Sequence, residues 1–260
     1  MILRRIIEHV KAQHWTAIVI DFVIVVVGVF IGIQVSNWND AQAERRLGQS
    51  YVERLRLDVE NDKVFWSNLV AYYGAVLESI DQADTLLADP AGDAKATVLN
   101  AYRASEISNS PQTRATWDEI VSSGHIGLLP RTLLDSGLAI YYSIDVANQS
   151  FLDLQDSAYR HRARSLIPLS IQKAIRATCS DLRDEAERVL GFMPECRLDV
   201  EPALLEATAA ALRADAELKA ALHYQYSQVF TAQANIRGGV VLLERALAVL
   251  KGDRKPGAAP

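Results

Sequence analysis

The sequence predicts an all-α protein in which one N-terminal transmembrane helix precedes a soluble antiparallel helical bundle. Three observations lead to this prediction. An apolar stretch lies near the N-terminus, apolar residues elsewhere recur every three or four positions, and no segment alternates between apolar and polar residues or carries a hairpin turn. We therefore expect no sheet, and we expect the chain to divide at residues 1–14, 15–38, 39–251 and 252–260.

Residues 1–14 are predicted to form a basic amphipathic helix on the membrane surface. Apolar residues recur at helical spacing on one side, and charged residues lie opposite. The apolar set is Ile2, Leu3, Ile6, Ile7 and Val10, and the charged set is Arg4, Arg5, Glu8 and Lys11.

Residues 15–38 are predicted to cross the membrane. A helix needs about 20 apolar residues to span about 30 Å of hydrocarbon, and positions 22–33 carry no polar side chain. Trp15 and Trp38 lie 23 positions apart, or about 35 Å of helix, so their indoles are expected at the two membrane interfaces. A cleavable signal peptide is the main alternative, but the cleavage-like Ala41-Gln42-Ala43 lies well beyond the apolar run.

A narrow stripe of small and polar residues follows one face of this helix. At about 100° per residue, Asp21, Val25, Gly28, Gly32 and Ser36 fall within about 80° of arc. Gly28 and Gly32 form the small-xxx-small pattern that lets two helix backbones approach closely, so we expect a helix–helix contact here. Chance glycines and a hydrated Asp21 near the membrane boundary also fit. A third interpretation makes Asp21 a proton-carrying carboxylate.

The charges that flank the helix favour a cytoplasmic N-terminus. Arg4, Arg5 and Lys11 precede it, whereas Arg45 and Arg46 follow it. The expected location is the bacterial inner membrane, with the domain at 39–251 in the periplasm.

Only two cysteines occur, Cys179 and Cys196. They fit either a disulfide formed in an oxidising compartment or two unpaired thiols in a helical core.

Two blocks of the chain resemble a bacterial family. Positions 21–40 read DFVIVVVGVFIGIQVSNWND, and positions 117–126 read WDEIVSSGHI and are followed by Tyr141-Tyr142. The first block has an acid, an apolar run with glycine, then Gln-x-x-Asn-Trp-Asn and a second acid. The second block has Ser-Ser-Gly and the paired tyrosines. Both patterns resemble the domain of unknown function 6090. That family usually has glycine where this chain has Ile20. The resemblance implies a single-span envelope protein and supplies no activity or catalytic residue.

The soluble region is predicted to be a series of helices with short breaks. They are expected at about residues 41–89, 94–107, 115–122, 130–154 with an extension toward 166, 171–190 and 202–250. The first has no internal proline and is expected to continue from the membrane helix. Its stop is Pro90-Ala91-Gly92, Pro168 marks a later break, and Gly238-Gly239 is expected to kink the last helix. Residues 252–260 are expected to be a disordered tail.

Chemical motifs are lacking in this sequence. The five histidines are scattered, and neither a metalloprotease motif, a phosphate-binding glycine loop nor a nucleophile elbow occurs. A net charge of −5 without a clustered basic face argues against nucleic acid as a partner. We therefore expect a non-enzymatic protein with no cofactor and no metal.

Three weaker candidates remain in the soluble region. Trp117, His125 and Tyr142 could line a ligand pocket, although such aromatic residues are more often core. Ser122-Ser123-Gly124-His125 is more simply a helix end than a catalytic group. The acids Asp58, Glu60 and Asp62 are interpreted as a solvated surface.

The leading functional hypothesis is an envelope protein that acts as a scaffold. It would contact the lipid bilayer and bind itself or another membrane protein. The alternatives are a ligand-sensing domain that signals through its anchor, an energy-transducing component that uses Asp21, and a hydrolase without a legible motif.

Overall fold

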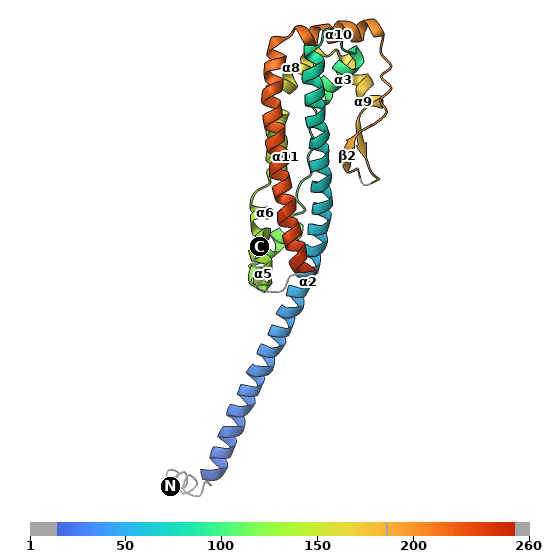
Figure 1. Cartoon of the computed structure of the whole chain (residues 1–260). Helices are drawn as coiled ribbons and strands as arrows, with labels where there is room; N and C mark the ends of the chain where they lie inside the picture. The colour runs from blue at the N-terminus through green and yellow to red at the C-terminus, as the bar shows by residue number, and fades with distance from the viewer. Residues whose placement is uncertain (1–14, 186, 253–260) are drawn as a thin grey trace, which may run out of the picture. The chain divides into compact units, whose positions relative to one another are not determined.

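The computed structural model describes residues 15–185 and 187–252, and these residues are mostly helical (Figure 1). The chain divides into two compact units, Met1–Tyr51 and Val52–Pro260. The prediction of an all-α fold is confirmed for the described residues apart from one short β-hairpin. The amphipathic helix predicted at residues 1–14 lies outside the described residues, as do positions 253–260 of the predicted tail.

The long helix α2 covers Trp15–Ala88 and is continuous, as the absence of proline predicts. Its residues up to 51 belong to the first unit, and the rest belongs to the second. The helix ends before the predicted stop, where the amide of Gly92 donates to the carbonyl of Asp89 at 3.2 Å and the amide of Ala91 donates to Asp89 Oδ1 at 2.9 Å.

The second unit is built on the antiparallel pair of α2 and α11, which covers Ala216–Leu250. Ion pairs Lys63–Glu244 at 3.1 Å and Glu60–Lys251 at 2.9 Å join the start of this part of α2 to the end of α11. The buried side chains of α2 recur every three or four positions, so one face of the helix enters the core. They include Leu55, Val59, Trp66, Leu69, Tyr73, Val76 and Ile80.

Shorter elements cover this pair (Figure 1). They are α3 Ala94–Arg103, α4 Ala115–Ser122, the 3-10 helix η1 His125–Leu128, α5 Arg131–Leu133, the π-helix η2 Leu134–Leu138, α6 Ala139–Ser143, α7 Val146–Gln155, α8 Ala158–Leu166, α9 Leu169–Thr178 and α10 Pro202–Ala214. Helix α11 contacts η2, α7 and α8, and α10 contacts α3.

Helix starts follow ordinary capping chemistry. Side-chain oxygens of Asp93, Asp145, Ser157 and Asp215 accept backbone N–H groups at the beginning of α3, α7, α8 and α11. Pro202 begins α10, where its missing N–H costs no hydrogen bond.

Several predicted helix bounds are wrong, and local chemistry explains the differences. The helix predicted at 94–107 ends at Arg103, and the helix predicted at 202–250 is divided at Asp215, whose cap starts a new helix. The helix predicted from Pro130 is broken after Ser143, where Asp145 caps α7. Helix α11 continues through Gly238-Gly239 without the expected kink.

A two-stranded hairpin contradicts the prediction that no sheet is present. The helix predicted at 171–190 ends at Thr178, and β1 Asp181–Arg183 then pairs antiparallel with β2 Val189–Phe192. Glu187 adopts a positive φ of 58° in the turn, and the amide of Asp184 donates to the carbonyl of Arg188 at 3.0 Å. The hairpin is therefore closed by a tight turn that the helical spacing did not predict.

Candidate functional site

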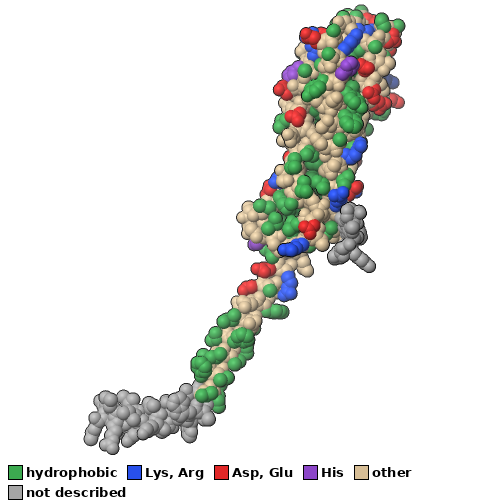
Figure 2. All heavy atoms as spheres, turned by 60° about the vertical axis from the view of Figure 1, so that its left-hand side comes forward, with side chains coloured by type: hydrophobic (Ala, Val, Ile, Leu, Met, Phe, Trp, Pro, Cys, Tyr) green, Lys and Arg blue, Asp and Glu red, His purple; other side chains and the backbone are tan. Residues whose placement is uncertain are grey.

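The apolar segment of α2 is the most distinctive feature of the first unit. Its apolar side chains are exposed, from 46% at Val27 to 67% at Phe22, and Trp38 is 63% exposed. Figure 2 shows them as a continuous apolar band. Among the described residues, one helix near the N-terminus is long and apolar enough to cross a membrane. The side chains of Trp15 and Asp21 lie outside the part that the structure describes.

The small-residue stripe lies on an open face of this helix. The backbone is helical throughout positions 15–88, so Gly28, Gly32 and Ser36 are spaced by one turn each. A Cβ atom added at Gly28 or Gly32 would meet no atom within 4 Å. The glycines are therefore not required by packing within this chain.

Two of the three predicted pocket residues pack against each other. The rings of Trp117 and Tyr142 stack with their centroids 4.8 Å apart and their planes 13° apart, and both side chains are buried. His125 is half-buried on η1, where its Nδ1 lies 2.9 Å from Ser123 Oγ. Stacking fills the space between the aromatic rings, so these residues form packed core at this point and not an open pocket between them.

Asp62 anchors a buried polar network that the sequence did not predict. The interpretation of Asp58, Glu60 and Asp62 as a solvated surface is wrong for Asp62, which is 1% exposed. Its carboxylate accepts hydrogen bonds from the Thr113 amide at 3.0 Å, from Thr113 Oγ1 at 2.6 Å and from the Tyr141 hydroxyl at 2.8 Å. Burial raises the pKa of Asp62, against the opposing effect of these hydrogen bonds.

The network ties the paired tyrosines to the loop before α4. Gln112 Nε2 donates to the carbonyl of Tyr141 at 2.5 Å, and Arg114 Nη1 donates to the carbonyl of Tyr142 at 2.5 Å. Burial also raises the pKa of Tyr142 above the ordinary tyrosine value, so its hydroxyl stays protonated at neutral pH. The carboxylate and the tyrosines therefore act here as hydrogen-bonding groups that hold a loop on α2.

A signal for Asp62 was present in the sequence. The buried stripe of α2 runs through Leu55, Val59, Trp66 and Leu69, and Asp62 falls on the same face between Val59 and Trp66. An acid on the buried face of a helix is expected to have hydrogen-bond partners in the core, because an unpaired buried charge is destabilising.

Among the cavities that flank α11 in the second unit, two are also lined by residues of α6 or α7. The larger, of about 800 Å³, lies between α7 and α11 and is lined by Ser150, Leu152, Asp153, Tyr224, Gln228 and Asn235 among others. A smaller one, of about 240 Å³, is lined by Trp66, Ile140, Tyr141, Ile144, Gly238 and Leu242 among others. Neither is lined by Trp117, His125 or Tyr142.

The two cysteines form a disulfide that joins the end of α9 to the segment after β2. The Cα atoms of Cys179 and Cys196 are 4.8 Å apart. The two cysteines are 17 positions apart in the sequence, and the loop that the bond closes contains the whole hairpin. Of the two alternatives that the sequence left open, the structure has the bonded one.

Metal chemistry has no visible centre in the described part of the chain, where no group of three or more His, Cys, Asp or Glu side chains is placed to hold an ion. Comparisons with protein-family models, with curated proteins and with solved structures return no match. The features of the described residues that bear on function are the membrane-type helix, the disulfide and the polar groups of the helical domain.

Proposed function

We propose that this chain is a single-pass protein of the bacterial inner membrane whose periplasmic helical domain works by binding a partner, without catalysis. The N-terminal part of α2 is its anchor. The observation that carries the proposal is the exposed apolar segment of that helix, in which the described side chains from Val19 to Val35 are not buried by the rest of the chain.

The anchor follows from the cost of leaving this surface in water. Apolar surface contributes about 25 cal/mol per Å² when it leaves water, and a contiguous exposed apolar patch of this extent is typical of a surface that contacts lipid or protein. A helix of about 20 apolar residues has the length of the hydrocarbon layer. Lipid accounts for an apolar surface that surrounds the helix on all sides.

The disulfide supports a periplasmic domain. Disulfides persist in oxidising compartments and are rare in the cytosol, and Cys179–Cys196 lies in the second unit. The excess of Arg4, Arg5 and Lys11 over Arg45 and Arg46 favours the same orientation. The resemblance to the domain of unknown function 6090 also fits a single-span envelope protein.

The binding role is proposed to begin within the membrane, where Asp21, Gly28, Gly32 and Ser36 present one face to a second helix. Glycines at this spacing allow close backbone approach, and both have open space around them in the single chain. The partner is proposed to be a second copy of this chain or another membrane protein.

Fractionation tests the anchor. After cell lysis without detergent, the full-length chain is expected in the pellet on ultracentrifugation and is expected to resist extraction by alkaline carbonate. Placing arginines at Val25 and Val29 is expected to release it, because a charged residue at the helix centre costs about 2.5 to 3.5 kcal/mol. Full-length wild-type chain in the supernatant would overturn the proposal.

Crosslinking tests the helix contact. Gly28→Ile with Gly32→Ile is expected to abolish crosslinked dimers or mixed complexes in native membranes, whereas Val27→Ile with Ile31→Val, on other faces of the helix, is expected to leave them unchanged. Equal crosslinking by both double variants would exclude the glycine face as the contact.

A further inference from the structure

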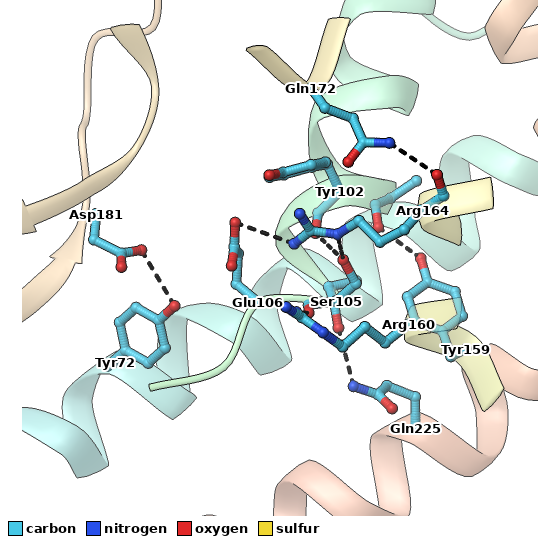
Figure 3. Close-up of polar contacts among 12 residues, drawn as sticks. Tyr72, Tyr102, Ser105, Glu106, Tyr159, Arg160, Arg164, Gln172, Asp181 and Gln225 are labelled. Carbon is cyan, nitrogen blue, oxygen red and sulfur yellow. Dashed lines mark hydrogen bonds and ion pairs between the residues drawn. The ribbon is translucent and has the colours of Figure 1, made fainter. Parts of the chain in front are cut away.

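Four arginines converge on the loop that follows α3 in the second unit. Arg103 ends α3, Arg160 and Arg164 lie one turn apart on α8, and Arg176 lies on α9. Figure 3 shows Arg160 and Arg164 reaching toward Ser105 and Glu106. We call these four residues the arginine cluster.

Existing contacts hold two of these guanidinium groups in place. Arg160 Nη1 donates to the carbonyl of Ser105, and Arg164 Nε donates to Ser105 Oγ at 2.8 Å. The Arg164 guanidinium also lies over the Tyr102 ring, 3.5 Å from its centroid. The groups are thus positioned before any ligand arrives, which lowers the entropy cost of binding.

Acidic side chains compensate only part of this charge. Glu106 and Asp181 are the described carboxylates that interact electrostatically with Arg103. Glu106 forms an ion pair with Arg164 at 3.2 Å. Asp181 is already shared, because it accepts a hydrogen bond from the Tyr72 hydroxyl at 3.2 Å and pairs with Arg183 at 3.3 Å. Four positive groups against two negative ones leave two positive charges in excess.

Buried polar atoms without a hydrogen-bond partner lie in this region. They include Arg103 Nε and, beside the same loop, Oε1 of Gln225, a residue that is 1% exposed, whereas Arg164 Nη2 has the ion pair with Glu106 at 3.2 Å. Gln225 is held there by its Nε2, which donates to the carbonyl of Ala104 at 3.3 Å. A buried donor without an acceptor is destabilising, so the Nε–H group of Arg103 and the excess of positive charge together favour an anion at this place.

Burial opposes the positive charge of the cluster. It lowers the pKa of Arg103 and, together with the neighbouring charge of Arg164, the pKa of Arg160. Both groups remain protonated at neutral pH, since arginine titrates far above it. The guanidinium groups repel one another and have lost hydration, and a bound anion would relieve both unfavourable effects.

We propose that the arginine cluster binds a phosphate group. Guanidinium forks match the oxygens of phosphate in two-point hydrogen bonds, and a phosphate group carries a charge of about −1.5 to −2 at neutral pH, which balances the excess. Arg103 Nε donates to its oxygens, Arg164 Nη2 exchanges its ion pair with Glu106 for the phosphate, and Arg160 and Arg176 supply charge. This site is separate from the proposed membrane function and does not depend on it.

Calorimetric titration of the full-length chain in detergent micelles with inorganic phosphate tests the proposal. Ionic strength is held constant with sodium chloride. Saturable binding is expected, and Arg103→Gln is expected to raise the Kd by at least about tenfold, the value of one charge-assisted hydrogen bond. Absence of saturable phosphate binding to the wild-type chain overturns the proposal.

A matched control is available at Arg213. This half-buried arginine also contacts main-chain carbonyls, donating to Leu86 at 3.2 Å and to Gly92 at 2.8 Å, but it lies outside the cluster. Arg213→Gln is expected to leave the Kd unchanged. If it weakens binding as much as Arg103→Gln does, the loss is a general effect on folding and the assignment of the site is wrong.

A gain in affinity separates binding from folding damage. Glu106→Gln removes a carboxylate that competes with the ligand, so it is expected to lower the Kd roughly tenfold, a result that partial unfolding cannot imitate. Titration with glycerol 3-phosphate distinguishes the source of the group. Tighter binding than inorganic phosphate assigns a phosphate ester, and weaker binding assigns the free ion. Unchanged affinity in Glu106→Gln contradicts the proposed charge balance.

Discussion

Trp66 and Gly239 determine how closely α2 and α11 approach within the second unit. A Cβ atom at Gly239 would lie 2.1 Å from Trp66 Cζ3, which is far inside van der Waals contact. The Trp66 indole has little freedom to move away, because it is fully buried and its Nε1 donates to the carbonyl of Ser110 at 3.1 Å. Glycine is therefore required at position 239, and the helix tolerates its low helical propensity there.

Replacing Gly239 with alanine is expected to lower the free energy of unfolding by about 1 to 3 kcal/mol, the usual cost of overpacking a core. Gly238→Ala is the matched control, because a Cβ there meets no atom within 4 Å. It is expected to raise stability by up to about 1 kcal/mol through helix propensity. Denaturant unfolding of both variants measures the difference, and equal effects would show that the contact with Trp66 is absent.

Asp62 is expected to make the stability of the domain depend on pH. Burial raises its pKa in the folded state, so the folded chain takes up a proton at a higher pH than the unfolded chain does. The free energy of unfolding that this carboxyl contributes therefore rises as the pH falls through its folded pKa, and it becomes constant below the ordinary aspartate value of about 3.9.

Comparison with Asp62→Asn isolates this effect from the other acids. The stability of the wild-type chain relative to the variant is expected to increase between pH 7 and pH 4, by at most about 1.4 kcal/mol for each pH unit. Urea unfolding at a series of pH values measures it. A constant difference between the two proteins, or one that shrinks on acidification, contradicts a raised pKa at this carboxyl.

The disulfide-linked hairpin packs against the aromatic side of α2. Phe192 of β2 contacts the Tyr72 ring, with centroids 5.3 Å apart, and lies beneath the Arg103 guanidinium at 4.9 Å. Strands of three and four residues make few ladder hydrogen bonds of their own. The disulfide at the base of the hairpin is therefore expected to keep it folded.

Loss of the disulfide is expected to destabilise the domain by about 3 kcal/mol, the value for a closed loop of this size. The measurement is the unfolding midpoint of the wild-type chain with and without a reducing agent. The double variant Cys179→Ser with Cys196→Ser serves as the control, because its midpoint is expected to be low and insensitive to the reducing agent. A midpoint in wild type that does not respond to confirmed reduction would refute this role.

Periodicity predicted most helices, but it did not predict where tertiary contacts interrupt them. The π-helix η2 contains Gly137 at a φ of 96°, against the side chain of Leu242, whose Cδ2 would lie 2.7 Å from an added Cβ. That contact comes from α11, more than a hundred residues later, so no local pattern reports it. The hairpin was missed because its strands are too short to show a two-residue period.

Some candidate sites were predicted from the sequence and others were not, because tertiary contacts bring together residues that lie far apart in the chain. Trp117 and Tyr142 were expected to lie near each other as pocket residues, with core packing as the simpler interpretation, and the disulfide was one of two alternatives. The arginine cluster could not be assembled from spacing alone, since only Arg160 and Arg164, one turn apart, belong to the same helix. Its other members arrive from α3 and α9 through the folding of the domain.

The proposed orientation in the membrane determines which compartment holds the helical domain. The excess of positive charge before the membrane helix over that after it is small, so a few substitutions can reverse it. Arg4, Arg5 and Lys11 oppose only Arg45 and Arg46. Replacing Arg4, Arg5 and Lys11 with glutamine would leave more positive charge after the membrane helix than before it. The domain is then expected to stay in the cytoplasm in a substantial fraction of molecules.

The redox state of Cys179 and Cys196 reports the outcome, because a cytosolic domain keeps its thiols reduced. Alkylation of intact cells before denaturation is expected to label these thiols in the charge variant and not in the wild-type chain. Arg45→Gln with Arg46→Gln strengthens the original bias and is expected to remain fully oxidised. Reduced thiols in wild type would reverse the proposed topology, since the bond that stabilises the domain forms only where an oxidant is present.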